Sequence, residues 1–209
     1  MMNNPFKDRD LHTLLLFPKI SWSSYSSFTD YDKDEWYNRY VLGIRSEPNS
    51  AMAFGVYVGE RLVSDPLFLP EVPRPEIYEL ELKSKIGDIE IIGHLDGWSP
   101  ETKELLEYKT TCNPNRWTQE KVDAWDQVTM YCLLLWQNYK IRPEDVTIRL
   151  TAIMGQEEED SFEIHLTNEI KVFSTKRTMK DILVFGSEIK HVHKEMQKFI
   201  NNKQKDETN

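Results

Sequence analysis

Two carboxylates and one ammonium occur in neighbouring segments of the chain that have the character of β-strands. Asp96 ends a β-branched segment, and Glu107 and Lys109 lie two residues apart in the next one. Side chains two apart on a strand leave the same face, so Glu107 and Lys109 point the same way. If the turn at 99–103 pairs the two strands, Asp96 lies close to Glu107. We therefore expect these three groups to converge at one end of a sheet.

This combination of groups suits the hydrolysis of a phosphodiester bond. Clustered carboxylate oxygens bind Mg²⁺ or Mn²⁺, which neutralises the scissile phosphate and activates a water molecule. A nearby cation orients the nucleophile or stabilises developing charge. Asp96 and Glu107 would hold the metal ion, and Lys109 would serve the water and the phosphate. Gln127 and Tyr131 are one helical turn apart, so they share a helix face that can press against the same site.

The surrounding pattern predicts an α/β domain in which a sheet of about five strands carries these residues. A proline-rich loop at 65–75 separates a helical front from the strands. Helices are expected over 21–43, as one helix or two short ones, and over 51–62, 118–139 and 178–199. Strands are expected over 77–82, 88–95, 104–111, 146–154 and 162–166.

Length and cysteine content bound the organisation of the chain. A chain of 209 residues and 24.8 kDa is long enough for one full-sized domain. We expect an N-terminal extension over 1–20, the domain over 21–200, and a disordered polar tail over 201–209. The two cysteines, Cys112 and Cys132, are too few for a disulfide framework, a four-cysteine zinc site or an iron–sulfur cluster. Any metal ion is therefore expected to be bound by oxygen or nitrogen.

Composition and charge narrow the class of protein further. No apolar run approaches the roughly 20 residues of a membrane span, and the apolar stretch 11–20 is broken by Pro18 and lacks the features of a signal peptide. We expect a cytoplasmic protein of a bacterium or of a phage-infected host cell, with no membrane contact. The net charge of −9 argues against a broad basic surface that coats nucleic acid. Any contact with DNA would be local.

The residues of the expected metal site resemble the core motifs of the PD-(D/E)XK nuclease superfamily, specifically of its RecB-like and lambda-exonuclease-like branches. The matching motifs are Asp96, the pair Glu107-x-Lys109 and the pair Gln127-x-x-x-Tyr131. The resemblance spans 21–150, about two thirds of the chain. It implies a restriction-endonuclease-like core, in which a mixed sheet is flanked by helices, and metal-dependent cleavage of DNA.

The resemblance also implies two further metal ligands. One is the backbone carbonyl of Tyr108. The other is Glu60, which stands where many RecB-like members have a histidine and lambda-exonuclease-like members have a carboxylate. Relatives with an iron–sulfur cluster need four cysteines, so this chain belongs with those that lack the cluster. The expected cofactor is Mg²⁺ or Mn²⁺, as one ion or as two.

Basic and aromatic side chains near the motifs are candidates for DNA contact. They are Arg116, Trp117, Lys121, Lys176 and Arg177. Cationic side chains neutralise phosphates, and an indole stacks on unpaired bases. A solvated helix face explains these basic side chains equally well. Trp98 and Trp117 are the better stacking candidates, because Trp125 and Trp136 lie on the apolar stripe of the predicted helix 118–139.

Together these features predict a divalent-metal-dependent deoxyribonuclease, most simply an exonuclease in DNA recombination, repair or phage DNA processing. The expected partners are DNA and a separate helicase, annealing or recombination protein, because the chain lacks the phosphate-binding loop of a motor. Two alternatives stay open: a catalytically silent nuclease-fold module that binds DNA or a partner, and an endonuclease on the same scaffold. A monomer and a homo-oligomer, such as a ring around DNA, both fit the sequence.

Overall fold

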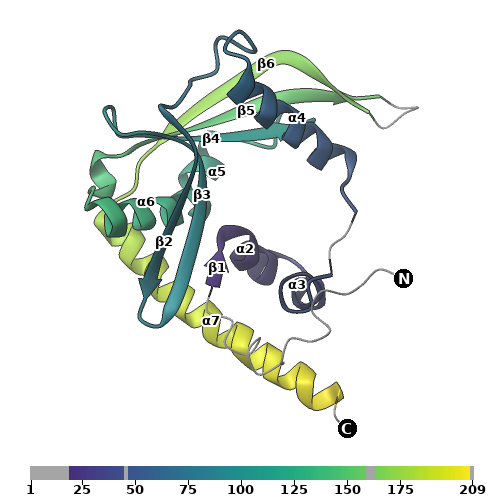
Figure 1. The fold of residues 1–209 in the computed structure, drawn as a ribbon, viewed down its shortest axis with the longest axis vertical. Coiled ribbons are helices and arrows are strands. Elements are labelled where there is room, and N and C mark those ends of the chain that lie inside the picture. Colours follow the sequence, from purple (N-terminus) through teal and green to yellow (C-terminus); the bar gives the residue numbers. More distant parts are fainter. Residues whose placement is uncertain (1–18, 45–46, 159–162, 208–209) are drawn as a thin grey trace.

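A computed structural model describes residues 19–44, 47–158 and 163–207, which form a six-stranded mixed sheet with helices around it (Figure 1). The strands are β1 (Lys19–Ser21), β2 (Ile77–Ile86), β3 (Ile89–Ser99), β4 (Glu104–Thr111), β5 (Thr147–Glu157) and β6 (Ile164–Thr175). Their order is β1-β3-β4-β5-β6, and β2 pairs with the other edge of β3. The pairs β1–β3 and β4–β5 are parallel, and the other pairs are antiparallel. The mixed α/β fold is confirmed.

Strands β1 and β4 pair with the same edge of β3, and the site lies in the gap between these two pairings. On this edge β1 pairs with residues 90–92 and β4 pairs with residues 97–99. Within the described part of the chain, residues 93–96 have no strand partner on this edge, although β2 pairs along the other edge. Asp96 therefore lies where β3 and β4 separate.

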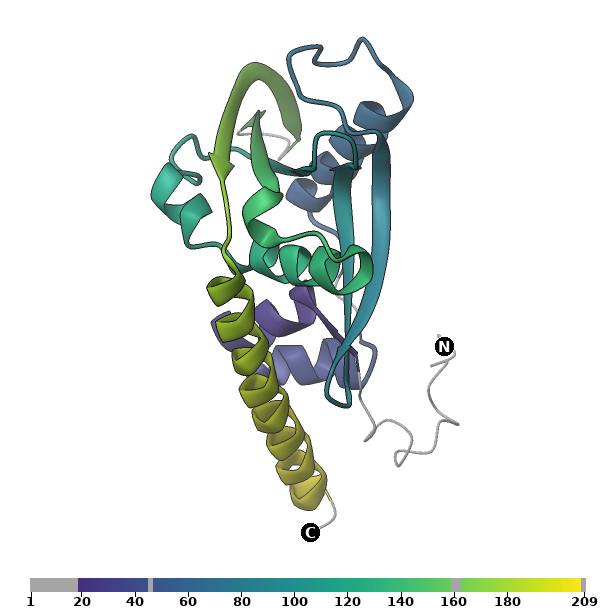
Figure 2. The same ribbon diagram turned by 90° about the vertical axis from the view of Figure 1, so that its left-hand side faces the viewer.

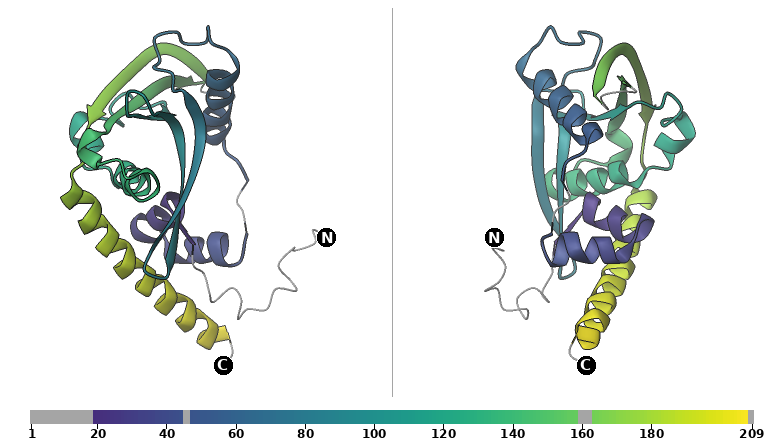
Figure 3. Two further views of the ribbon diagram at one scale, coloured as in Figure 1. Left: turned by 60° about the vertical axis from the view of Figure 1, so that its left-hand side comes forward. Right: turned by 90° about the vertical axis from the view of Figure 1, so that its right-hand side faces the viewer.

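Helices cover both faces of the sheet. They are α2 (Trp22–Asp30), α3 (Lys33–Trp36), the π-helical turn η1 (Tyr37–Val41), α4 (Ser50–Ser64), α5 (Gln119–Asp123), α6 (Asp126–Tyr139), the 3₁₀ turn η2 (Pro143–Asp145) and α7 (Met179–Glu207). Helix α6 packs against β2 and β3 and lies between them and α7 (Figure 3). On β5, Leu150 and Ala152 pack with Val122 of α5, whereas Ile153 packs with Phe54 of α4. Successive strand residues face opposite sides, so α4 covers the face opposite α5.

The long helix α7 closes the core on the α6 side (Figure 2). Its buried stripe repeats every three or four residues: Ile182, Phe185, Ile189, Val192 and Met196. This spacing places all five side chains on one face, as an amphipathic helix requires. Full burial of side chains of this size contributes about 1.5–3 kcal/mol each, so the stripe is a substantial part of the core.

The predicted helix 118–139 is two helices in the structure. Ala124 and Trp125 separate α5 from α6, and Trp125 has an extended backbone (φ −86°, ψ 115°) as the N-cap residue of α6. The Nη2 atom of Arg177 donates to the carbonyls of Val122 and Trp125, at 3.2 and 3.0 Å. These contacts join residues 55 and 52 positions apart. The break therefore depends on a tertiary contact that helical periodicity does not reveal.

The ends of the fold also differ from the sequence-based expectation. Strand β1 begins the sheet at Lys19, inside the predicted extension 1–20, whose residues 1–18 lie outside the described residues. The predicted tail 201–209 is helical through Glu207, because α7 continues and its Lys, Gln and Glu residues favour a helix. The range 21–43, predicted as one helix or two short ones, holds the short helices α2 and α3 and the turn η1. None of the helices in the described ranges has the length and apolar character to cross a membrane.

Candidate functional site

The fork between β3 and β4 brings Asp96 next to strand β4. The last paired residues of the two strands are Gly97 and Leu106. Beyond this pair, the Asp96 side chain of β3 bonds to the backbone of β4. Its Oδ2 atom accepts a hydrogen bond from the Tyr108 N–H at 2.9 Å. The N–H and C=O of one strand residue point to the same edge, so the Tyr108 carbonyl also faces the fork. The juxtaposition of Asp96 and β4 expected from the turn at 99–103 is present.

Glu107 is completely buried and only half satisfied. Its Oε1 atom accepts from Lys109 Nζ and from Gln127 Nε2, both at 2.8 Å. Its Oε2 atom is buried and has no hydrogen-bond partner among the residues that the structure describes. Burial raises the pKa of Glu107 to about 8, against the opposing effect of Lys109. A buried carboxylate oxygen without a partner is costly, and a bound cation would satisfy it.

Charges around Glu107 set the protonation of its neighbours. Burial raises the pKa of Asp96, and the nearby Lys109 and the Tyr108 N–H oppose that rise. Burial alone would lower the pKa of Lys109, but the carboxylates of Glu107 and Asp96 outweigh it and raise the pKa. The Lys109 side chain is 32% exposed, so part of it reaches solvent. The site thus joins a protonated lysine to two carboxylates whose pKa values are raised.

Gln127 of α6 donates a hydrogen bond to Glu107, and Tyr131 of the same helix contacts Gln127. Gln127 Nε2 lies 2.8 Å from Glu107 Oε1 and 2.7 Å from the Tyr131 hydroxyl, which donates to the His94 carbonyl at 2.8 Å. This approach requires Gly93, because a Cβ atom there would lie 3.0 Å from the Tyr131 ring and 2.6 Å from Leu134. The structure therefore brings together all five residues that the sequence assigns to catalysis.

The residues at the fork fit a divalent cation by their chemistry. Asp96, the unpartnered Glu107 Oε2 and the Tyr108 carbonyl are oxygen donors, the kind that Mg²⁺ and Mn²⁺ prefer. Among the described residues, no group of three histidine, cysteine or carboxylate side chains is close enough to hold an ion by itself. The carbonyl and water would therefore have to complete the coordination.

A cavity of about 530 Å³ lies between α4 and the fork and contains both Glu60 and Asp96. Glu60 is exposed on α4. It lines the same cavity as Asp96, together with Tyr108 and Thr110 from one face of β4. Glu79 of β2 lines this cavity too, between Tyr78 and Leu80, which pair with Gly97 and Leu95 of β3. Its φ of 51° is left-handed, which costs roughly 1–2 kcal/mol for a residue other than glycine. Sequence patterns give no signal for such a position.

Three of the five residues predicted to bind DNA lie close together in the chain: Arg116 and Trp117 precede α5, and Lys121 belongs to it. Arg116 and Lys121 are exposed, and Lys121 Nζ donates to the Arg116 carbonyl at 3.0 Å. Trp117 is half-buried, and its ring lies 4.8 Å from the ring of Trp125. Trp125 in turn lies beside Lys109, with 5.2 Å between the ring centroid and Nζ. Arg116, Trp117 and Lys121 are therefore linked to the site through Trp125.

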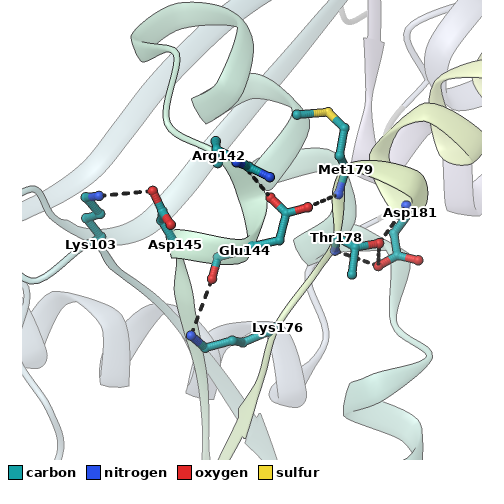
Figure 4. A network of polar contacts seen from close by, with 8 residues as sticks. All are labelled: Lys103, Arg142, Glu144, Asp145, Lys176, Thr178, Met179 and Asp181. Atoms are coloured by element: carbon teal, nitrogen blue, oxygen red, sulfur yellow. Dashed lines mark hydrogen bonds and ion pairs between the residues drawn. The ribbon is translucent and has the colours of Figure 1, made fainter.

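The other two residues have different surroundings. Figure 4 shows Lys176 in a polar network around η2, where its Nζ donates to the Glu144 carbonyl at 3.4 Å. The Glu144 carboxylate accepts from the Met179 N–H at 2.7 Å, which lowers the Glu144 pKa. Arg177 is only 5% exposed, and its guanidinium donates to Thr129, Thr175 and backbone carbonyls. Its place in the core gives Arg177 a structural role. The prediction that Arg177 contacts DNA is therefore wrong.

The tryptophans are placed differently from the sequence-based expectation. Trp98 is 2% exposed, so it is not available for stacking on a base. Trp125 is half-buried and packs against the core, and its ring also lies beside Lys109 Nζ. The helical spacing of the sequence runs on through Ala124 and gives no sign of the break, so it does not predict the contact between Trp125 and Lys109.

Comparisons with known proteins bear on the fold. Neither a protein-family model nor a curated protein matches the sequence. A candidate exonuclease from Eubacterium rectale superposes with a TM-score of 0.59 at 10% identity, over 95% of this chain and 86% of that one. A phage-related exonuclease from Haemophilus somnus 129PT gives 0.56 at 12% identity, over 92% and 93%. An alkaline exonuclease from Laribacter hongkongensis gives 0.53 at 14% identity, over 92% and 94%. The chain thus has the fold of these exonucleases, which confirms the nuclease fold that the sequence motifs imply.

Proposed function

We propose that this chain is a divalent-metal-dependent deoxyribonuclease that hydrolyses phosphodiester bonds, most simply as an exonuclease. The observation that carries the proposal is Glu107: a fully buried carboxylate with one unpartnered oxygen, next to Asp96 and Lys109 at the fork. A structural ion pair would satisfy both carboxylate oxygens. An oxygen that is left free among oxygen donors suits a metal ion.

Each residue of the site has a role in this proposal. Asp96, Glu107 and the Tyr108 carbonyl would hold the cation, and Glu60 would contribute to a second ion from the α4 side. A bound cation supplies charge neutralisation at the phosphate and activates water. Lys109, whose side chain is partly exposed, would orient that water and stabilise charge on the phosphate. Gln127 and Tyr131 fix the Glu107 carboxylate on the α6 side.

Three similar structures carry the word exonuclease in their descriptions, and one of them is phage-related. This supports an exonuclease over an endonuclease and a role in recombination, repair or phage DNA processing. DNA is then the substrate. A separate helicase, annealing or recombination protein would deliver it, either to a monomer or to a homo-oligomer.

Cleavage of labelled DNA tests the proposal directly. End-labelled linear DNA, double- and single-stranded, and a covalently closed circle are incubated with Mg²⁺, Mn²⁺ or EDTA. We expect metal-dependent loss of the linear forms only, and no cleavage by Asp96→Ala. Asp88→Asn is the matched control, because Asp88 is an exposed carboxylate in the turn of the same hairpin. Cutting of the circle would favour an endonuclease, and DNA binding without any cleavage would favour the silent module.

A further inference from the structure

The ring of Trp125 lies beside the ammonium of Lys109. The geometry points to Trp125 as a positioning residue, which fixes the ammonium of Lys109 through the face of its indole ring. This inference rests on the proposed function and assigns Trp125 no contact with substrate. It adds a residue that none of the sequence motifs contains.

Two contacts define the position of the Lys109 ammonium. Nζ lies 2.8 Å from Glu107 Oε1 and 5.2 Å from the centroid of the Trp125 ring. A cation within about 6 Å of a tryptophan centroid, over the ring, is attracted by the ring quadrupole. Lysine has four rotatable bonds in its side chain and loses much rotamer entropy when it is held in one place. A second, broad contact surface reduces the number of positions that Nζ can adopt.

Trp125 is itself held on several sides, as a positioning group must be. Its carbonyl accepts from the buried Arg177 at 3.0 Å, which fixes the backbone at the N-cap of α6. Its ring contacts Trp117, with 4.8 Å between the centroids, and meets the edge of Trp22 at 6.5 Å. A side chain clamped in this way keeps a fixed ring plane beside Lys109.

The ring contact differs from the carboxylate contact in an important way. Glu107 is shared between Lys109, Gln127 and the cation that the proposed function requires. A cation on Glu107 would withdraw charge from the Lys109 contact. The attraction of the Trp125 ring does not depend on the charge of Glu107, so it holds the ammonium in either case.

Two substitutions at Trp125 separate positioning from packing. Trp125→Phe keeps an aromatic face, and Trp125→Leu keeps an apolar side chain without a face. Trp136→Leu is the matched control, because it removes a half-buried indole from the same helix. For Trp125→Leu we expect kcat on linear DNA to fall about three- to thirtyfold with KM unchanged. We expect Trp125→Phe to recover part of this loss, and Trp136→Leu to lower the melting temperature without lowering kcat at 25 °C.

A spectroscopic readout tests the contact without relying on activity. The ring current of Trp125 should shift the ε-methylene protons of Lys109 upfield in the NMR spectrum, and Lys109→Met would identify the signal by removing it. We expect the shift to vanish in Trp125→Leu, to persist in part in Trp125→Phe, and to remain in Trp136→Leu.

The possible results are distinguishable. The inference is overturned if the Lys109 signal is unshifted in the wild-type chain, or if Trp125→Leu keeps the wild-type kcat. It is also overturned if Trp125→Leu raises KM alone, which would indicate a direct contact with DNA, or if Trp136→Leu lowers kcat equally. An inactive wild-type chain would refute the proposed function, and the Lys109 signal would still support or refute the ring contact. If Trp125→Leu does not fold, the comparison of wild type with Trp125→Phe decides.

Discussion

At the scale of single residues, the buried carboxylate of Glu107 lowers the stability of the fold and suits the chemistry of the site. Glu107 has no exposed surface, and within residues 19–44, 47–158 and 163–207 its Oε2 atom has no hydrogen-bond partner. Transfer of a carboxylate out of water costs several kcal/mol unless it is paired and hydrogen-bonded. Lys109 and Gln127 satisfy only Oε1. The residue is therefore better suited to binding a cation than to stabilising the fold.

The burial of Glu107 predicts opposite effects of one substitution on activity and on stability. Glu107→Gln should abolish cleavage, because an amide cannot replace an anionic metal ligand. Its free energy of unfolding in EDTA at pH 9, above the raised pKa of Glu107, should be unchanged or higher by about 1 kcal/mol, because the buried charge is gone. Urea unfolding and the DNA assay measure the two effects. Glu104→Gln, three residues earlier on β4, should keep cleavage and lose less than about 1 kcal/mol with its Arg149 ion pair. A Glu107→Gln variant that still cleaves DNA would contradict the site.

The raised pKa of Glu107 also predicts how stability and metal binding depend on pH. Burial raises the pKa from an ordinary value near 4.5 to about 8. Between these values the folded chain binds more protons than the unfolded chain, so stability without metal should fall as the pH rises from about 4.5 to 8. Metal binding requires the deprotonated carboxylate, so the melting temperature gained from Mn²⁺ should increase over the same range. Thermal melts from pH 5 to 9, with EDTA or Mn²⁺, test both trends. Glu107→Gln should flatten both, and a pH-independent gain from Mn²⁺ would refute the assignment.

At the scale of secondary-structure elements, the site depends on how closely α6 approaches β3. Gln127 and Tyr131 reach Glu107 and the His94 carbonyl only because Gly93 leaves room for the Tyr131 ring. The same glycine lies in the part of β3 that, in the described part of the chain, has no strand partner on one edge. One small residue therefore sets the distance between the helix and the fork.

Gly93→Ala should destabilise the chain by about 1–3 kcal/mol, because the added Cβ would lie 2.6 Å from Leu134 and 3.0 Å from the Tyr131 ring. It should also lower kcat, because α6 must move and take Gln127 away from Glu107. Gly59→Ala is the matched control: a Cβ there meets nothing within 4 Å, and alanine should stabilise α4 by roughly 0.5–1 kcal/mol. Urea unfolding compares the two. Equal stability of both variants would show that α6 is less tightly packed than the contacts indicate.

The elements also show what could be predicted from the sequence. Strand alternation and the turn at 99–103 were sufficient to place Asp96 beside Glu107, because these contacts are local. The break between α5 and α6 could not be predicted, because Arg177 makes it from a distant part of the chain. The left-handed Glu79 is also invisible to residue patterns, since nothing in its type requires that backbone. Local pairing was predictable, and contacts between distant elements were not.

At the scale of the whole molecule, the charge distribution limits how DNA can be bound. The net charge is −9, so the surface as a whole repels a polyanion. Arg116 and Lys121 are exposed near Trp117, which is linked through Trp125 to Lys109. Arg177 is buried and Lys176 lies in the network around η2. The segment 116–121 is therefore the best candidate for phosphate contacts beside the site.

A small number of phosphate contacts predicts a shallow salt dependence of DNA binding. Each neutralised phosphate of duplex DNA contributes about −0.9 to the slope of log K against log salt concentration. Fluorescence anisotropy of a labelled duplex, measured with Asp96→Ala so that the DNA stays intact, gives this slope. Adding Lys121→Gln should make it shallower by about 0.9, because one phosphate contact is lost. Adding Lys198→Gln, which removes an exposed charge on α7, should leave the slope unchanged. If both variants change the slope equally, binding follows overall charge, and the segment 116–121 has no special role.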